Sequence, residues 1–310
     1  MRLDPEIEAL LSSMAERGIP GLREAPVEVF RAAVAGGLAL LPPPSDILHV
    51  EALTAEFFGG SAPARLYRPA AAPDALIVYY HGGGWALGSL DEYDRPLRHL
   101  ANLSGAAIVS VDYRLAPEHR FPAAVDDALG ALEWAAEAVG ELASPGARLF
   151  IAGDSAGGNL AAVAVQHARD RGLATAGQIL IYPATEGDVD ADYFSAFVPP
   201  ILTREDIAYF YDLYAPAGVD RSDPRLAPGR GRLAGLPPTL IVTAEHDLLT
   251  AEGRVYGGRL AAEGVEVEII DYPGAIHGFF SLGGGTALGR KAAVDIAEFV
   301  RRQAARSAPA

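Results

Sequence analysis

The order of apolar and polar positions along the chain predicts strands and helices in alternation. Short, almost wholly apolar runs are typical of strands buried on both faces of a parallel sheet, and they occur at residues 75–80, 106–111, 149–151, 178–182 and 239–243. Residues 265–270 form a further strand-like run in which apolar and polar positions largely alternate. Apolar residues recur at helical spacing in residues 121–139 and after residue 155. This succession predicts an α/β fold with a mostly parallel sheet.

Two segments ahead of the first buried strand have patterns of their own. Residues 4–14 and 26–34 predict amphipathic helices, with Pro20 in the link between them. Residues 51–67 predict two antiparallel strands joined at a pair of glycines. The two helices precede the core, so we expect them to cover part of it.

Residues 186–236 interrupt the alternation of strand and helix. An acidic, irregular run leads to a helix at residues 202–215, whose start carries a capping pattern from Thr203 to Asp206, and a return rich in proline and glycine follows. An insertion of this kind after a core strand is typical of a lid. Its aromatic residues are Tyr193, Phe194, Phe197, Tyr209, Phe210, Tyr211 and Tyr214. We expect most of them to form the core of the lid and the others to line a pocket beneath it.

Composition narrows the class of protein. The chain has 310 residues, half of them hydrophobic, which supports one large α/β domain with an appended subdomain. A net charge of −15 argues against nucleic acid, anionic membrane surfaces and strongly acidic substrates as partners. The chain has no cysteine, which excludes disulfides, thiolate catalysis and Cys-ligated metals and is compatible with a reducing cytosol.

The N-terminal sequence bears on localisation. It lacks the basic and apolar regions of a secretory signal, and the apolar run that ends at residues 38–41 is too short to span a bilayer. We therefore expect a cytoplasmic protein that does not insert into membranes.

The clearest candidate for chemistry is the serine in residues 147–158, ARLFIAGDSAGG. A strand, a sharp turn and a helix follow one another, with Ser155 at the turn and Gly153 and Gly157 two residues away on either side. Such a turn crowds its neighbours, so the flanking positions accept little more than glycine. In a chain with 34 glycines the motif alone fits an ordinary βα turn equally well. The strand before it and the helix after it favour a nucleophile elbow.

A second glycine-rich segment, His81-Gly82-Gly83-Gly84-Trp85, follows the strand at residues 75–80 directly. Three glycines after a strand can form a merely flexible loop. They can also present backbone N–H groups to a developing oxyanion, which acyl transfer requires. We expect His81 to hold this loop by hydrogen bonds rather than to act as a base.

The loop after the strand at residues 106–111 carries several charged groups. Taken alone, its Arg114 and Glu118 predict an ion pair within the loop, and we expect His119 to be scaffolding rather than catalytic.

Together these motifs resemble the hormone-sensitive-lipase-like branch of the α/β-hydrolases, the bacterial family IV carboxylesterases. The matching segments are HGGGW from residue 81, YRLAPEH from 113, GDSAGG from 153, SDPRLAP at 222–228, LPPTLIVTAEHDLL at 236–249 and GAIHGFF at 274–280. The resemblance covers nearly the whole chain. It implies an α/β-hydrolase fold: a mostly parallel central sheet flanked by helices, with a helical cap. Residues 1–48 and 186–236 would form the cap, and residues 49–185 and 237–310 the catalytic core.

Two further candidates, Asp247 and His277, lie just beyond predicted strands, where sites of parallel sheets are built. The order Ser155, Asp247, His277 is the one expected in α/β-hydrolases. Asp247 could instead cap a helix beginning at Leu248, with Glu245 or His246 in its place.

The family match DLLTAEG favours Asp247, although this chain has Leu248 where proline is common and Ala251 where an acid is common. His277 is the strongest base candidate among the histidines. His49, His99 and His167 have no catalytic context, and we expect them at the surface or in packing.

These residues predict an acyl-enzyme mechanism that needs no metal or organic cofactor. Ser155 would be the nucleophile, His277 the base, and Asp247 its orienting acid. The N–H of Ala156 and, by resemblance, those of Gly83 and Gly84 would form the oxyanion hole, with His81, Gly82 and Asp154 as support for the motifs.

Three functions fit the sequence. By family resemblance, the first is a carboxylesterase acting on small apolar esters with short to medium acyl chains. The second is a specialised hydrolase, such as an amide deacetylase, a lipase or an esterase for one secondary metabolite. The third is a non-catalytic ligand-binding member of the fold, against which the complete Ser155, Asp247 and His277 set argues. We expect a monomer or a homodimer.

Overall fold

Within the part of the chain that the structure describes, one eight-stranded sheet organises the fold, in the order β1-β2-β4-β3-β5-β6-β7-β8. The computed structural model describes residues 2–16, 21–38, 43–195, 197–281 and 286–306. The strands are β1 His49–Phe57, β2 Gly60–Arg68, β3 Ala75–Tyr80, β4 Ala107–Val111, β5 Arg148–Asp154, β6 Gly177–Ile181, β7 Thr239–His246 and β8 Val267–Ile276. Only β2 runs antiparallel to its neighbours, β1 and β4, and the other pairs are parallel. The prediction of a mostly parallel sheet is confirmed.

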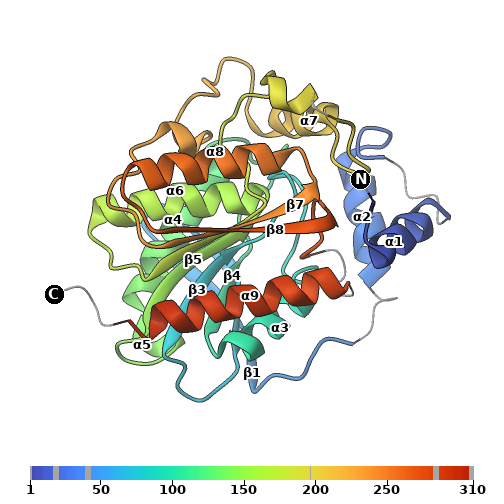
Figure 1. Cartoon of the computed structure of the whole chain (residues 1–310). Coiled ribbons are helices and arrows are strands. Elements are labelled where there is room, and N and C mark those ends of the chain that lie inside the picture. Colours follow the sequence, from blue (N-terminus) through green and yellow to red (C-terminus); the bar gives the residue numbers. More distant parts are fainter. Residues whose placement is uncertain (1, 17–20, 39–42, 196, 282–285, 307–310) are drawn as a thin grey trace.

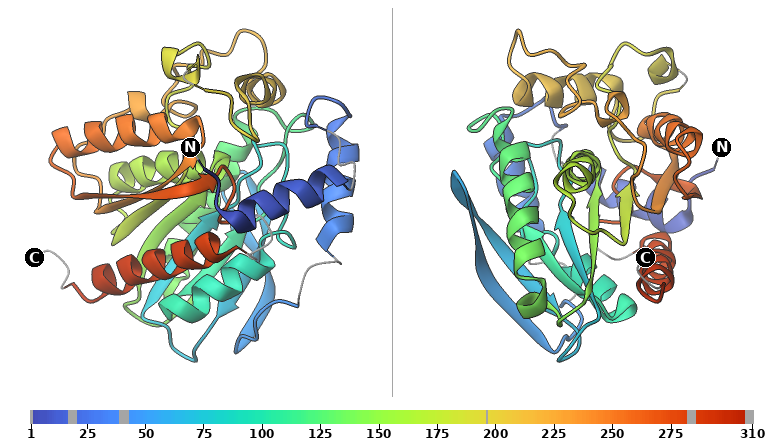
Figure 2. Two further views of the ribbon diagram at one scale, coloured as in Figure 1. Left: turned by 45° about the vertical axis from the view of Figure 1, so that its right-hand side comes forward. Right: turned by 90° about the vertical axis from the view of Figure 1, so that its left-hand side faces the viewer.

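Helices cover both faces of this sheet (Figures 1 and 2). On one face lie α4 Ala123–Glu137, α6 Ala156–Arg171 and α8 Leu249–Ala262, and on the other α3 Asp94–Ser104 and α9 Ala287–Ala304, which pack together. A short helix, α5 Val139–Leu142, follows α4. Neither α3 nor α9 was among the elements predicted from the apolar pattern.

The two faces have separate apolar cores, and β3 shows how the sequence supplies both. Leu76, Val78 and Tyr80 face the core beneath α4, α6 and α8. The alternate residues, among them Ile77 and Tyr79, face the core beneath α3 and α9. Because successive side chains of a strand point to opposite faces, a strand buried on both must be apolar throughout. Each fully buried aliphatic side chain contributes about 1.5–3 kcal/mol.

Strands β7 and β8 extend further than the apolar pattern predicted. Residues 244–246 and 271–276, expected in loops, belong to these strands and pair with each other, with a register irregularity between Ala244 and His246. Polar residues in these extensions, such as Glu245 and Asp271, conceal the strand in the sequence. The helix predicted at residues 121–139 ends at Glu137, before α5 begins.

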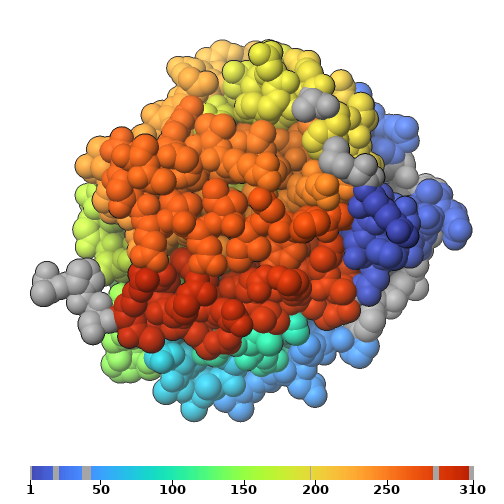
Figure 3. Space-filling view, in the orientation of Figure 1, coloured from blue at the N-terminus to red at the C-terminus, as the bar shows by residue number. Residues whose placement is uncertain are grey.

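The first two helices, α1 Pro5–Glu16 and α2 Val27–Leu38, gather at one end of the sheet with α7 Arg204–Tyr214, which is far from them in sequence (Figures 1 and 2). Two 3₁₀ turns, η1 Asp192–Ser195 and η2 Pro228–Arg230, lie in the same insertion as α7. Thr203 and Asp206 form the predicted capping box at the start of α7. Helix α1 lies against the C-terminal part of the core (Figure 3), where the N–H of Asp4 donates to the carbonyl of Gly274 at 3.1 Å.

Pro20 and residues 39–41 of the predicted apolar run lie outside the described residues. Across the ranges that the structure describes, every helix is too short or too polar to cross a membrane.

Candidate active site

Ser155 lies at the tip of the turn from β5 to α6, with a backbone φ of 55° that is uncommon for a residue with a side chain. The turn is tight. A Cβ atom on Gly157 would lie 2.0 Å from the carbonyl oxygen of Tyr80, and one on Gly153 would lie 2.2 Å from the carbonyl oxygen of Gly157. Neither position therefore has room for a side chain, and the serine hydroxyl is held at the first turn of α6.

The structure brings Ser155, His277 and Asp247 into one hydrogen-bonded chain. Nε2 of His277 lies 2.9 Å from Oγ of Ser155, and its Nδ1 lies 2.7 Å from Oδ2 of Asp247. A carboxylate only accepts, so Nδ1 carries the proton that it donates to Asp247, and Nε2 of the neutral ring accepts from the serine hydroxyl. Asp247 is 2% exposed, which shields this chain from water.

Asp247 also serves the helix that follows it. Its Oδ1 accepts the N–H of Leu249, the first residue of α8, at 2.9 Å. The helix thus begins one residue later than predicted. Asp247 caps this helix and also bonds to His277, so the two alternatives considered for it are compatible. Glu245 instead accepts the N–H of Gly274 at 2.8 Å, and His246 is the last residue of β7.

The segment of residues 82–88, here called the glycine loop, faces the same space as Ser155. Its backbone is left-handed at Gly83, Gly84 and Trp85, with φ of 117°, 60° and 56°. Among the described residues, the N–H groups of Gly83 and Gly84 donate no hydrogen bond. Ala156 opens α6, so its N–H has no partner within the helix. Three backbone donors are thus available around the serine.

Neither glycine of this loop can carry a side chain. A Cβ on Gly83 would lie 2.3 Å from the carbonyl oxygen of Leu87, and one on Gly84 would lie 2.2 Å from the ring of Phe210. The loop is therefore packed between the core and α7.

Asp154 binds the backbone at the start of the glycine loop. It is 1% exposed and accepts hydrogen bonds from the N–H of Gly82 at 2.8 Å, from the hydroxyl of Tyr79 at 2.9 Å and from that of Tyr93 at 2.8 Å. Burial raises the pKa of Asp154, and these three donors act in the opposite direction. Tyr93 was not singled out from the sequence, because nothing near it marks a partner 61 residues away.

His81 holds the same loop from its other side. Its Nδ1 lies 2.8 Å from the carbonyl oxygen of Gly82, and its ring stacks on that of Tyr113. Burial lowers the pKa of His81 to about 4, so the imidazole is neutral at pH 7.

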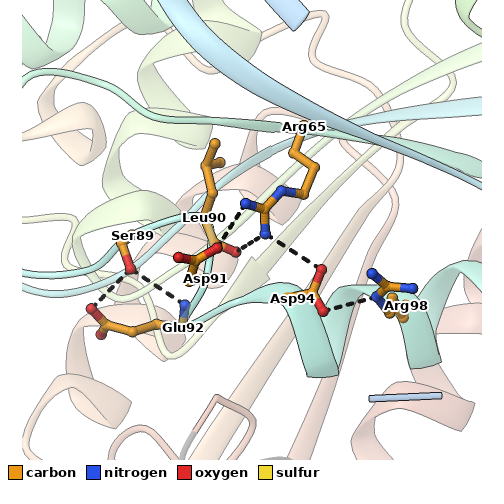
Figure 4. Close-up of polar contacts among 7 residues, drawn as sticks. All are labelled: Arg65, Ser89, Leu90, Asp91, Glu92, Asp94 and Arg98. Atoms are coloured by element: carbon orange, nitrogen blue, oxygen red, sulfur yellow. Dashed lines mark hydrogen bonds and ion pairs between the residues drawn. The ribbon is translucent and has the colours of Figure 1, made fainter. Parts of the chain in front are cut away.

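A polar network fastens the segment that leads from the glycine loop to α3 (Figure 4). Arg65 of β2 lies at its centre and donates to the carbonyl of Leu90 and to the carboxylates of Asp91 and Asp94. Arg98 bonds the second oxygen of Asp94, and Ser89 bonds Glu92. The network fixes the start of α3, from which Tyr93 reaches Asp154.

The predicted ion pair between Arg114 and Glu118 is wrong. Arg114 pairs at 2.7 Å with Asp127 of α4, and Glu118 pairs at 2.7 Å with Arg31 of α2. Both true partners come from helices that pack beside the loop, and their closeness is not visible in the sequence. His119 does not line the cavity described next, and His49 and His167 bond to carboxylates elsewhere.

A cavity of about 670 Å³ lies over Ser155. Its walls are mainly apolar, and they include Leu10, Leu11 and Met14 of α1, Phe30 and Val34 of α2, and Ile201, Leu202, Ile207, Phe210 and Tyr211 of the insertion. Phe210 and Tyr211 are the two aromatics of the insertion that line it. Such a cavity suits the apolar part of a small molecule with one reacting polar group. The described ranges hold no cluster of three or more histidine, aspartate or glutamate residues placed to bind a metal ion.

Comparisons with known proteins agree with this architecture. A family model described as an alpha/beta hydrolase fold matches residues 77–281. The chain is 44% identical over 266 residues to the carboxylesterase NlhH of Mycobacterium tuberculosis, with 82% of each chain covered. It is 39% identical over 236 residues to an ethyl acetate hydrolase of Pseudomonas putida, with 73% of each covered.

A solved structure is similar over almost the whole molecule. The hyperthermophilic esterase from the archaeon Pyrobaculum calidifontis matches with a TM-score of 0.90 and 39% identity, over 98% of this chain and 99% of that one. With its serine elbow and glycine loop in the positions of the family motifs, the chain belongs to the α/β-hydrolases, in the hormone-sensitive-lipase-like branch of carboxylesterases.

Proposed function

We propose that this protein is a serine carboxylesterase that hydrolyses small apolar esters with short to medium acyl chains. One observation carries the proposal: His277 lies between Ser155 Oγ, at 2.9 Å, and Asp247, at 2.7 Å, on the floor of an apolar cavity. The relatives named carboxylesterase and ethyl acetate hydrolase support the same chemistry. Residues 1–48 and 186–236 would form the cap over a core of residues 49–185 and 237–310.

The reaction follows from the hydrogen-bonded chain. Ser155 attacks the ester carbonyl carbon while Nε2 of His277 takes its proton, because a serine hydroxyl alone is too weak a nucleophile at neutral pH. Asp247 orients the ring and stabilises the imidazolium that forms. His277 then protonates the leaving alcohol, and a water activated by the same histidine hydrolyses the acyl-enzyme. These steps require no cofactor.

The negative oxygen of the tetrahedral intermediate would accept hydrogen bonds from the N–H groups of Gly83, Gly84 and Ala156. Losing one such donor typically lowers kcat by about 10²-fold to 10³-fold. We further propose that the enzyme acts in the cytoplasm, as a monomer or homodimer, on a freely diffusing ester.

The test is hydrolysis of p-nitrophenyl esters from acetate to palmitate by the wild type and by Ser155→Ala. We expect rates to peak at short or medium chains and kcat to fall by at least about 10³-fold in the variant, with the fold retained. Ser61→Ala, an exposed serine of β2, is the matched control and should behave as the wild type.

Wild-type turnover by Ser155→Ala would refute the serine mechanism. A folded wild type that cleaves no chain length but does cleave an acetamide or a complex natural ester would instead identify a specialised hydrolase. Binding without turnover of any substrate would identify a ligand-binding protein.

A further inference from the structure

The glycine loop is held at its two ends by different parts of the molecule. At its start, the N–H of Gly82 bonds to Asp154 in the core. Beyond Gly84, the carbonyl of Trp85 accepts the N–H of Ala116 at 2.8 Å, and the carbonyl of Ala86 accepts Nε–H of Arg31 at 2.8 Å. Arg31 belongs to helix α2, so the N-terminal segment reaches the loop directly.

The Arg31 guanidinium gathers three partners. Besides the carbonyl of Ala86, it donates through Nη2 to the carbonyl of Ala116 at 2.7 Å. It also makes a two-pronged pair with Glu118, at 2.7 and 3.0 Å. Because the N–H of Ala116 already holds Trp85, Arg31 closes a ring of hydrogen bonds between the glycine loop and the loop of residues 113–119. A lysine ammonium lacks the planar fork that this arrangement uses.

Helix α2 also makes an apolar contact with the side chain of Ala86. Val27 of α2, Ala86 and Phe210 of α7 form a small buried cluster, so α2 packs on the side chain of Ala86 and binds its carbonyl. The Arg31 side chain is 27% exposed, so its bonds are partly shielded from water. The ring of Phe210 in turn packs on Gly84. The position of Gly84 therefore depends on contacts that α2 and α7 share.

From this geometry we propose that Arg31 is a positioning residue for the oxyanion donors. It holds the carbonyl of Ala86 and thereby fixes the left-handed turn at residues 83–85, so that the N–H groups of Gly83 and Gly84 stay aimed at the oxyanion. The inference rests on the proposed esterase function. Arg31 acts through the loop backbone, and its effect belongs to the transition state, where the oxyanion is fully charged.

The experiment compares Arg31→Ala and Arg31→Lys with the wild type on the best p-nitrophenyl ester. We expect kcat to fall about 10-fold to 100-fold in both, with KM changed by less than about 3-fold, since a small misplacement of the donors weakens transition-state binding most. Added guanidinium ion, at concentrations that leave the wild type unaffected, should restore part of kcat to Arg31→Ala by occupying the vacated place.

Two variants serve as controls. Arg23→Ala removes another ion pair of the N-terminal segment, to Asp206 at 3.0 Å, without touching the glycine loop. Glu118→Gln removes the charged partner of Arg31 but leaves both carbonyl bonds. We expect kcat within about 3-fold of wild type for both, because surface ion pairs of this kind contribute little.

Unchanged kcat in Arg31→Ala, a loss confined to KM, or an equal loss in Arg23→Ala would each overturn the inference. If Arg31→Ala does not fold, Arg31→Lys carries the test, and wild-type kcat in that variant would likewise overturn it. Failure of the esterase function itself is distinct, because the wild type would then show no turnover on any ester.

Discussion

At the scale of single residues, Asp154 accepts hydrogen bonds both from core side chains and from the backbone of the glycine loop. Four donors converge on its two oxygens: the hydroxyls of Tyr79, Tyr93 and Tyr182 and the N–H of Gly82, which begins the glycine loop. A buried acceptor that loses its donors, or a donor that loses its acceptor, destabilises a fold by about 1–3 kcal/mol. Asp154 therefore links the stability of the core to the placement of the loop.

Replacing Asp154 by asparagine should lower both stability and kcat. The amide has one acceptor oxygen and an NH₂ group, so the donors that bond to one of the two carboxylate oxygens lose their acceptor. We expect the free energy of unfolding to fall by about 1–3 kcal/mol. Urea unfolding and steady-state kinetics measure the two effects.

Tyr93→Phe is a smaller change at the same network, since it removes one hydroxyl and leaves the carboxylate of Asp154 in place. Its losses should be smaller than those of Asp154→Asn. Wild-type stability and kcat in Asp154→Asn would contradict the role given to this carboxylate.

The sequence reveals residues whose geometry admits few alternatives and conceals those whose partners are distant. Ser155 between its glycines, and Asp247 and His277 beyond strand ends, could be proposed before any coordinates. Arg31 could not, because its partner Ala86 is 55 positions away and the bond is to a backbone carbonyl, for which no particular side chain is required. Arg114 was likewise paired with Glu118, four residues along the chain, because its true partner Asp127 is 13 residues away on another element.

At the scale of elements, α8 supports the start of the insertion. Oε2 of Glu252 accepts the N–H groups of Thr185 and Glu186, at 2.6 and 3.1 Å, and its Oε1 lies 3.3 Å from the hydroxyl of Tyr193. Glu186 pairs in turn with Arg259, about two turns further along α8, at 2.9 Å. The first residues of the insertion are thus attached to the helix that Asp247 caps.

Glu252 should make stability depend on pH. Burial raises its pKa to about 7, against an ordinary value of 4.5, although the two N–H donors act in the opposite direction. The folded state therefore binds the proton more tightly than the unfolded state. This contribution to stability is fully present below pH 4.5 and is lost as the pH rises through about 7.

The glutamine of the Glu252→Gln variant cannot ionise. Between about pH 5 and pH 8, the free energy of unfolding of this variant should therefore fall less than that of the wild type. Chemical denaturation at both pH values measures the difference. Glu263→Gln, an exposed acid at the end of the same helix, should keep the wild-type dependence. Parallel pH profiles for the wild type and Glu252→Gln would disprove the assignment.

Strands could be predicted from the sequence where burial on both faces makes every residue apolar. The apolar run located β3 at its true bounds, because both of its faces are covered. The ends of β7 and β8 were missed, since their last residues pair only with each other and include polar side chains. Helices α3 and α9 bury one side each, and their apolar residues do recur at helical spacing, as Leu97, Leu100 and Ala101 do in α3; this signal was present in the sequence and was missed.

At the scale of the whole molecule, the net charge and the cavity act together. The chain carries a net charge of −15, and its cavity has mainly apolar walls, drawn in large part from α1, α2 and the insertion. The family motifs allowed the catalytic core to be predicted from the sequence. The size of the cavity could not be predicted, because its walls come from segments about 190 residues apart that only the fold brings together.

The charge should discriminate between esters of different charge. Long-range repulsion lowers the encounter rate of an anionic ester, and salt screens it as the Debye length falls from about 30 Å at 0.01 M to about 3 Å at 1 M. We expect kcat/KM for a p-nitrophenyl hemisuccinate to rise several-fold over this range relative to p-nitrophenyl butyrate. The neutral ester corrects for general effects of salt. If the ratio of the two kcat/KM values did not change with salt, the net charge would have no influence on how an anionic ester enters the cavity.

The double use of Asp247 has a consequence for divergence. Substitution of Ser155 or His277 removes a reacting group, whereas substitution of Asp247 also removes the acceptor for the first N–H of α8. A descendant under selection only to bind a ligand could therefore discard the serine or the histidine freely and still be penalised for losing the aspartate. Among non-hydrolytic descendants of such a protein, the acid should be the last of the three to disappear.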